Sequence, residues 1–318
     1  MMIEDLFRRG ILRLAEQPKD NPKSLSELEK LKLVLIPIDH DYPGGSAAMH
    51  NAVFRKYGLD YKTAFVVAKP EDVKLIIDTF REDPRYVGGG VGSGFKDKAV
   101  KYVDELSELA KILGSINVIQ KQDGRLIGHN TDGIGFVRGF LREYPDSVAG
   151  RKILILGAGG TTLPITYELV MLNPREIVIL NRTVEKAKNI ADRLPKTVKN
   201  RYGGEGQIGV EVVDSDIVIN TSNKGASELK EYTAFAPITG DHMNTALKNL
   251  RRLPQKAIVS DILLGDETPT LRLAKNRGLR VHNGKDMNLY QAIPAFKLMT
   301  GIKKILDSDL EDIMRNAR

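Results

Sequence analysis

The feature that most restricts the fold of this chain is an apolar segment that runs directly into a glycine-rich turn. Residues Lys152 to Leu156 read Lys-Ile-Leu-Ile-Leu, and Gly157-Ala158-Gly159-Gly160 follow at once. A short, continuous apolar run is typical of a strand that is buried on both faces of a parallel sheet. The segment after the glycines has a helical pattern as far as about Leu172. Strand, glycine turn and helix together predict the start of a βαβ unit.

The same alternation continues toward the C-terminus. Glu176 to Leu180 predicts a second strand, and Val184 to Leu194 predicts a helix. We expect further strands at Ile217 to Asn220 and at Ala257 to Asp261. Strands that alternate with helices in this way favour a parallel, doubly wound sheet of the Rossmann type.

The first part of the chain alternates less regularly, which predicts a separate α/β domain. Pro145 and Gly150 interrupt the pattern, so we expect one domain over residues 1–147 and a second over residues 148–287. In the first part we expect strands at Leu33 to Ile36, Thr63 to Ala68 and Arg125 to Ile127, and helices at Met1 to Gln17, Ser46 to Tyr57, Glu71 to Phe80, Tyr102 to Leu113 and from near Ile134.

Composition excludes several classes of protein. The chain has 318 residues, which is long enough for two domains, and 42% are hydrophobic, which fits a globular protein. No apolar run approaches the ~18 residues of a membrane span, and the absence of cysteine excludes disulfides and thiolate metal sites. The net charge of +7 is scattered among acidic residues, so we expect no nucleic acid partner. No group of His, Asp and Glu has metal-ligand spacing, so we expect no metal. The absence of cysteine is compatible with a reducing cytosol, and we expect a cytoplasmic monomer or homodimer.

The glycine turn lies where a phosphate-binding turn has to lie. Gly157 permits the tight change of direction, and Gly159 lets the backbone approach a pyrophosphate at the N-terminus of the next helix. The third glycine of the usual motif is replaced by Thr162. A glycine turn that only connects two elements is the alternative.

The end of the second strand indicates which dinucleotide is bound. NAD-binding domains usually carry an acidic residue there, which accepts hydrogen bonds from the ribose 2′-hydroxyl. This chain has Asn181-Arg182-Thr183, with Lys186 one turn into the helix. Because a guanidinium attracts a 2′-phosphate, we predict NADP rather than NAD. The alternative for Arg182 is a solvated surface arginine.

Two charged residues are candidates for catalysis. Asp132 follows Asn130-Thr131 at the expected start of a helix, and Lys96 follows a glycine-rich run over residues 88–95 that we interpret as flexible. Taken alone, Asp132 fits a helix cap and Lys96 fits a surface lysine. Composition and spacing alone do not assign Asp132 and Lys96 to one site.

The order of several motifs along the chain does assign Lys96 and Asp132 to one site. Gly114 to Ile119, followed by Asp123 to Phe136, closely resembles the core motif of shikimate and quinate dehydrogenases. Motifs in the family's order extend from about Pro37 to Gly301. The other matches are Met49-His50-Asn51, Gly157 to Gly160, Asn181 to Thr183, Lys186-Ala187, and Gly284, Met287, Tyr290, Gln291 and Ala292.

The resemblance implies an NADP-dependent dehydrogenase with its active site in a cleft between two domains. It implies that Lys96 and Asp132 form the catalytic pair, and that Asn117 and Gln291 hydrogen-bond hydroxyls of a small-molecule substrate. Ser46 would be the remaining member of a serine pair that binds the substrate carboxylate. A positioned acid or base of this kind contributes ~10²–10⁴-fold in rate.

The resemblance also implies a cofactor site and a returning tail. The nicotinamide would lie near Asn220 to Gly225 and near Gly284 to Met287, and residues 288–318 would pack back on the first domain. The tail from Met287 to Ile305 has a helical pattern with turn points at Pro294 and Gly301. The predicted NADP(H)-binding residues are Gly157, Ala158, Gly159, Gly160, Asn181, Arg182, Thr183, Lys186, Thr221, Ser222, Gly284 and Met287.

Three departures from the family pattern concern the substrate. Gly44-Gly45-Ser46 stands where the family has Ser-x-Ser, and Gly90 to Lys96 keeps the lysine of Asn-Val-Thr-x-Pro-His-Lys but not its neighbours. An expected tyrosine is Leu264. Since hydrogen bonds to charged groups contribute ~1.5–3 kcal/mol each, shikimate should bind poorly unless Ser93 or a basic residue compensates.

We therefore expect a different polyhydroxylated alcohol or ketone as the substrate. One candidate is a neutral keto sugar such as 5-ketofructose, and another is a modified shikimate or quinate such as aminoshikimate. Two alternatives stay open. The chain is an authentic shikimate dehydrogenase with a rearranged carboxylate site, or it is a non-catalytic NADP-binding regulatory protein.

Overall fold

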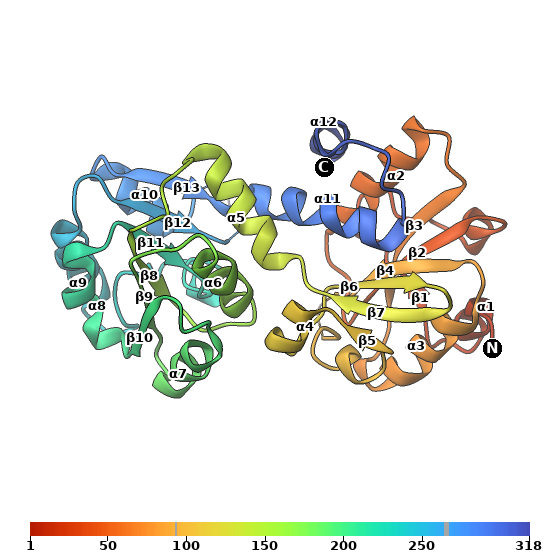
Figure 1. The fold of residues 1–318 in the computed structure, drawn as a ribbon, viewed down its shortest axis with the longest axis horizontal. Coiled ribbons are helices and arrows are strands. Elements are labelled where there is room, and N and C mark those ends of the chain that lie inside the picture. Colours follow the sequence, from red (N-terminus) through yellow and green to blue (C-terminus); the bar gives the residue numbers. More distant parts are fainter. Residues whose placement is uncertain (93, 264–266) are drawn as a thin grey trace. The chain divides into compact units, whose positions relative to one another are not determined.

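The computed structural model describes residues 1–92, 94–263 and 267–318 (Figure 1). Ser93 and Leu264, which bear on the predicted substrate specificity, lie outside the described residues. Residue contacts divide the chain into two compact units. Unit 1 consists of Met1–Thr131 and Asn288–Arg318, and unit 2 consists of Asp132–Met287.

Unit 1 is built on a seven-stranded mixed sheet with the order β1-β3-β2-β4-β6-β7-β5. Strand β2 pairs in parallel with both β3 and β4, whereas β4, β6 and β7 pair antiparallel. The strands are β1 (Arg13–Leu14), β2 (Lys32–Ile38), β3 (Tyr61–Val67), β4 (Tyr86–Gly90), β5 (Glu105–Leu106), β6 (Val118–Gln122) and β7 (Arg125–His129).

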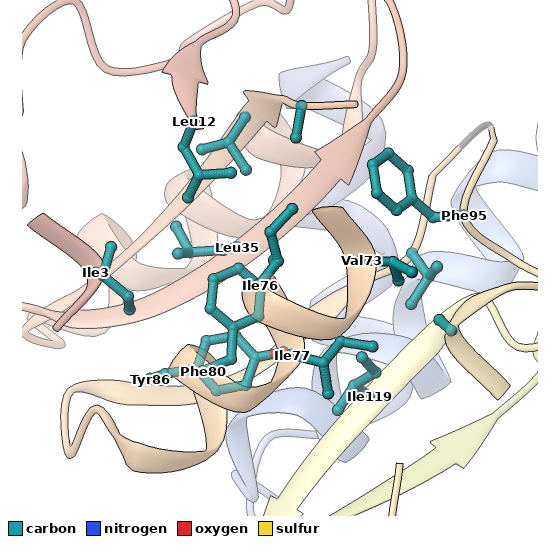
Figure 2. Packing of buried hydrophobic residues seen from close by; sticks show 14 of the residues in the cluster. Ile3, Leu12, Leu35, Val73, Ile76, Ile77, Phe80, Tyr86, Phe95 and Ile119 are labelled. Atoms are coloured by element: carbon teal, nitrogen blue, oxygen red, sulfur yellow. The ribbon is translucent and has the colours of Figure 1, made fainter. Parts of the chain in front are cut away.

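Strand β2 shows how this sheet separates two apolar layers, since successive side chains point to opposite faces. Leu35 packs in a cluster with Ile76 and Phe80, as Figure 2 shows. Val34 joins a second cluster that includes Phe296. Burying each such side chain stabilises the unit by roughly 1.5–3 kcal/mol. The helices of unit 1 are α1 (Ile3–Arg8), α2 (Ser46–Lys56), α3 (Val73–Glu82), α4 (Glu108–Leu113), α11 (Met287–Thr300) and α12 (Asp307–Ala317).

Unit 2 has a six-stranded, fully parallel sheet with the order β10-β9-β8-β11-β12-β13. This is the strand order of the Rossmann fold, and the crevice between β8 and β11 is where such folds bind dinucleotides. The strands are β8 (Lys152–Leu156), β9 (Glu176–Leu180), β10 (Lys199–Gly203), β11 (Ile217–Asn220), β12 (Ile258–Asp261) and β13 (Arg280–Asn283). The helices are α5 (Asp132–Glu143), α6 (Thr162–Val170), α7 (Val184–Arg193), α8 (Ile208–Glu211), α9 (His242–Arg252) and α10 (Pro269–Asn276).

The contacts divide the chain at residues 131 and 132 rather than at the expected 147 and 148. Helix α5 packs closely on α6, because a Cβ atom at Gly133 would overlap the carbonyl oxygen of Pro164. The Pro145 and Gly150 signals therefore mark the end of α5 and the loop before β8. They lie inside unit 2.

The described glycines of the run before Lys96 are closely packed, and for them our interpretation of the run as flexible is wrong. Its first residues form β4, between β2 and β6. A Cβ atom at Gly89 would overlap the Leu35 carbonyl, and one at Gly88 would lie 2.5 Å from the Met299 carbonyl oxygen. These glycines permit close backbone approach, which is the other reason for a glycine in a strand.

Three expected helices also differ from the structure. Met1 to Gln17 is helical only in α1, since Gly10 adopts a φ of +68° and β1 then pairs with β3. Tyr102 to Leu113 is helical only in α4, because β5 pairs with β7. Helix α11 continues through Pro294, where burial of side chains such as Phe296 offsets the missing hydrogen bond. It ends before Gly301, as expected.

Among the described residues, every helix is too short or too polar to span a bilayer.

Candidate active site

The glycine turn of unit 2 connects β8 to α6 in a conformation that only glycine adopts without strain at its first position. Gly157 has a φ of +125°, and a Cβ atom there would lie 2.6 Å from the backbone nitrogen of Ser222. The Thr162 hydroxyl donates to the Thr221 hydroxyl (2.9 Å), so the threonine at the third motif position ties α6 to the end of β11. The turn thus lies directly against the neighbouring strand end.

A cavity of about 410 Å³ opens beside this turn. It contains most of the residues predicted from sequence to bind the cofactor, whereas Gly157, Gly284 and Met287 do not line it. Gly284 instead packs on the end of β12, where a Cβ atom would lie 2.6 Å from the Asp261 carbonyl oxygen. The lining residues are Ala158, Gly159, Gly160, Thr161, Asn181, Arg182, Thr183, Lys186, Glu205, Thr221, Ser222, Asn223, Lys224, Leu229, Ile238 and Leu263.

The cavity suits a phosphorylated dinucleotide. A Cβ atom at Gly160 would meet nothing within 4 Å, so the turn leaves open space for a pyrophosphate. The Asn181 side chain donates to the Thr183 carbonyl (2.9 Å) and thereby fixes the loop that carries Arg182. Arg182 and Lys186 are exposed cations that line the cavity. This set of donors matches the phosphate groups of NADP.

Sequence reasoning missed a buried ion pair in the same cavity. The Lys224 ammonium lies 2.7 Å from a Glu205 carboxylate oxygen and donates to the Ala236 carbonyl (2.6 Å). Burial lowers the pKa of Lys224, the Glu205 carboxylate opposes that shift, and the charge of Arg182 adds to it. Lys224 lies four residues beyond β11 and Glu205 two beyond β10, so the pair exists only after the sheet has formed.

A hydrogen-bond network at the ends of β11 and β12 surrounds the buried carboxyl group of Asp261. Asp261, the last residue of β12, accepts from the Asn220 amide (3.1 Å), the Thr268 hydroxyl (2.7 Å) and the Leu263 backbone N–H (3.1 Å). Burial raises the pKa of Asp261 to about 6, although these hydrogen bonds oppose the shift. Leu263 lines the cavity, so this network fixes one wall of it.

Unit 1 brings the two predicted hydroxyl-binding residues together. The Asn117 amide donates to Gln291 Oε1 (3.1 Å) and to Thr131 Oγ1 (3.1 Å), and its carbonyl oxygen accepts from the Thr131 backbone N–H (2.9 Å). Asn117 comes just before β6 and Gln291 lies on α11, which are separated by 174 positions. These amides form a polar group of matched donors and acceptors.

The other residues predicted for substrate binding and catalysis lie in a turn or at the start of a helix. Ser46 is the first residue of α2, and Lys96 is half-buried, with its backbone carbonyl accepting from the Ile116 N–H (2.9 Å). Asp132 is buried at the start of α5 in unit 2. The pairing of Lys96 with Asp132 stays a prediction, since they belong to different units.

Comparison with known proteins agrees with this geometry. Residues 37–119 match the profile of the shikimate dehydrogenase substrate binding domain, and residues 141–234 match that of shikimate / quinate 5-dehydrogenase. Shikimate dehydrogenase (NADP(+)) of Methanocaldococcus jannaschii is 32% identical over 285 residues, which cover 88% of this chain and 93% of the relative. The chain belongs to the shikimate dehydrogenase family. The family resemblance expected from the motifs is thereby confirmed.

Solved structures extend the comparison. The shikimate 5-dehydrogenase of Listeria monocytogenes, in complex with shikimate and NAD, has a TM-score of 0.77 at 28% identity and covers 90% of this chain and 97% of its own. A shikimate dehydrogenase in complex with NADP+ has a TM-score of 0.72 at 31% identity, covering 90% and 96%. The 5-ketofructose reductase of Gluconobacter has a TM-score of 0.73 at 23% identity, covering 91% and 99%, and shows the shared fold. The predicted two-domain α/β class is confirmed.

Proposed function

We propose that this chain transfers a hydride between NADP(H) and a polyhydroxylated alcohol or ketone that lacks the carboxylate of shikimate. As a member of its family, the chain is a dehydrogenase that acts on CH–OH groups and uses NADP(H). The observation that carries the change of substrate is the packing around Gly44 and Gly92, two positions where the family has hydroxyl side chains.

The cofactor is held by unit 2 in this proposal. Backbone N–H groups at the start of α6 donate hydrogen bonds to the pyrophosphate, and Arg182 and Lys186 attract the 2′-phosphate. Bound NADP(H) supplies the hydride or accepts it. Fixing the cofactor on rigid strand ends leaves the remaining tasks, which are proton transfer and orientation, to unit 1 and the start of α5.

Lys96 and Asp132 perform the proton transfer. In the reductive direction, Lys96 donates a proton to the carbonyl oxygen of the substrate as the carbon receives hydride, and its ammonium stabilises the negative charge that develops on that oxygen. The Asp132 carboxylate orients the lysine and the substrate hydroxyl.

A short series of backbone links supports this pairing. The Ile116 N–H donates to the Lys96 carbonyl. Asn117 follows Ile116 in the sequence, and its side-chain carbonyl oxygen accepts from the Thr131 N–H. Asp132 follows Thr131 directly. Two hydrogen bonds and two peptide links therefore connect the two charged residues through the amide group that is proposed to bind substrate hydroxyls.

The proposed change of substrate rests on two hydroxyl side chains that the family has and this chain lacks, at positions 44 and 92. A Cβ atom at Gly44 would lie 2.8 Å from the Phe65 ring, and one at Gly92 would overlap the Ile38 side chain. Serine at position 44 or threonine at position 92 therefore requires repacking of a buried neighbour. Since each lost hydrogen bond to a carboxylate costs ~1.5–3 kcal/mol, a ligand with a carboxylate at this place should bind about 10- to 100-fold more weakly for each lost hydroxyl.

The experiment is a substrate panel that includes a matched pair of ligands. The rate of NADP reduction is measured with shikimate, its neutral methyl ester, quinate and polyols, and that of NADPH oxidation with the 3-keto acids and keto sugars. We expect kcat/KM to be higher for the ester than for shikimate and highest for a neutral polyol or keto sugar. Faster turnover of shikimate than of its ester would establish the rearranged carboxylate site instead. Binding of NADPH without turnover of any ligand would favour the regulatory protein.

A further inference from the structure

The ion pair between Lys224 and Glu205 is enclosed, although both residues line the cofactor cavity. The side chain of Lys224 is 5% exposed and that of Glu205 is 15% exposed. The lysine lies near Arg182, whose charge acts on it. Three cations and one carboxylate thus line one cavity, and the carboxylate is paired with the only buried cation of the three.

Glu205 follows the strand next to the one that leads to Arg182, and this position bears on cofactor selectivity. Strands β9 and β10 are parallel, Leu180 is opposite Gly203, and the Asn181 N–H donates to the Gly203 carbonyl (3.1 Å). Arg182 lies two residues beyond Leu180, and Glu205 lies two residues beyond Gly203. Arg182 and Glu205 therefore follow adjacent, paired strand ends by the same number of residues.

At the end of β9, the strand next to β10, a carboxylate normally favours NAD. It accepts hydrogen bonds from the ribose 2′-hydroxyl and repels a 2′-phosphate. An unpaired Glu205 would therefore weaken the preference that Arg182 and Lys186 create. The Glu205 carboxylate would therefore disfavour NADP binding in this cavity unless its negative charge is neutralised.

We propose that Lys224 is a specificity-determining residue that keeps the cavity selective for NADP by holding the Glu205 carboxylate. Its ammonium neutralises the carboxylate, so that the net charge beside Arg182 stays positive. This inference rests on NADP binding in this cavity. It does not depend on which substrate the enzyme reduces.

Lys224 also donates to the Ala236 carbonyl. The test therefore has to distinguish a structural role of Lys224 from its electrostatic effect on the preference for NADP. Its bond to Ala236 holds the segment that contains Leu229 and Ile238, two apolar residues that line the cavity. Loss of this anchor would weaken NADPH and NADH alike, because both share the adenosine part. Exposure of the Glu205 charge would weaken NADPH alone.

The test measures the dissociation constants of NADPH and NADH by isothermal titration calorimetry for the full chain and for Lys224→Met, Glu205→Gln and the double variant. Lys230→Met is the matched control, since Lys230 is an exposed lysine of the same segment that does not line the cavity. Thermal unfolding of each variant checks that it folds.

We expect Lys224→Met to weaken NADPH about tenfold, which corresponds to about 1.4 kcal/mol, and to change NADH less than about twofold. Adding Glu205→Gln should restore most of the NADPH affinity. Glu205→Gln alone should strengthen NADPH relative to NADH, which keeps the proposal testable if Lys224→Met does not fold. Equal weakening of both cofactors without rescue, or a loss of NADPH preference in Glu205→Gln, would overturn the proposal. Failure of the native chain to bind NADPH at all would instead refute the cofactor site.

Discussion

The buried charge network at the amino ends of the Rossmann strands provides a stability prediction with a defined pH dependence. Glu211 accepts two hydrogen bonds from the Arg201 guanidinium (2.7 Å each) and lies 2.8 Å from the Lys152 ammonium. The side chain of Glu211 is only 9% exposed. The Arg201 hydrogen bonds are the main cause that lowers the pKa of Glu211 from 4.5 to about 2.

The magnitude follows from this difference in pKa. At about 1.4 kcal/mol for each pH unit, ionised Glu211 stabilises the folded state by about 3 kcal/mol near neutral pH. Because the folded-state pKa lies below the unfolded one, this contribution is fully present above about pH 4.5 and is lost as pH falls toward 2. By pH 3, about 2 kcal/mol of it should be gone.

The assay is urea unfolding of the native chain and of Glu211→Gln at pH 7 and pH 3, followed by circular dichroism. Glu211→Gln should lower the free energy of unfolding by about 3 kcal/mol at pH 7 and by much less at pH 3. Asp192→Asn is the control, since its pair with Lys188 is exposed and should contribute about 0–1 kcal/mol. Equal losses for the two variants at pH 7, or a Glu211→Gln loss that does not change with pH, would refute the reasoning.

Three further predictions concern the proposed site. Arg182→Ala should weaken NADPH about tenfold or more and leave NADH nearly unchanged in calorimetry; an equal effect on both would remove the 2′-phosphate role. Lys96→Ala should lower kcat about 10²–10⁴-fold while NADPH still binds; full turnover would exclude Lys96 as the proton donor. Gly157→Ala should lower stability by about 1–3 kcal/mol in thermal unfolding, because its φ is positive and Ser222 lies close. Gly160→Ala, in open space, should change stability little, and a similar loss in both would contradict the strain argument.

The parts of the fold that the sequence predicted are those whose stabilisation is local. Strands β8, β9 and β11 have the expected bounds because each is a continuous apolar run that is buried on both faces. The glycine turn and Arg182 follow two of these strands directly in the sequence, so most of the predicted cofactor residues line one cavity.

The missed strands depend on contacts that are distant in sequence. Strand β10 lies at one edge of its sheet and is mostly polar, and β13 lies at the other edge. Strand β4 contains three glycines that carry no strand signal of their own and are required because Leu35 and Met299 approach the backbone. Lys224 and Glu205 meet only because β10 and β11 belong to the same sheet. No local pattern marks either residue.

The direct test of the account is a double-mutant cycle on kcat/KM with Lys96→Ala, Asp132→Asn and both together, using the best substrate from the panel. Two residues that act on the same oxygen should give a double variant no slower than about the slower single variant. Losses that multiply would mean that Lys96 and Asp132 act independently. That result would contradict the paired proton transfer on which the proposed function depends.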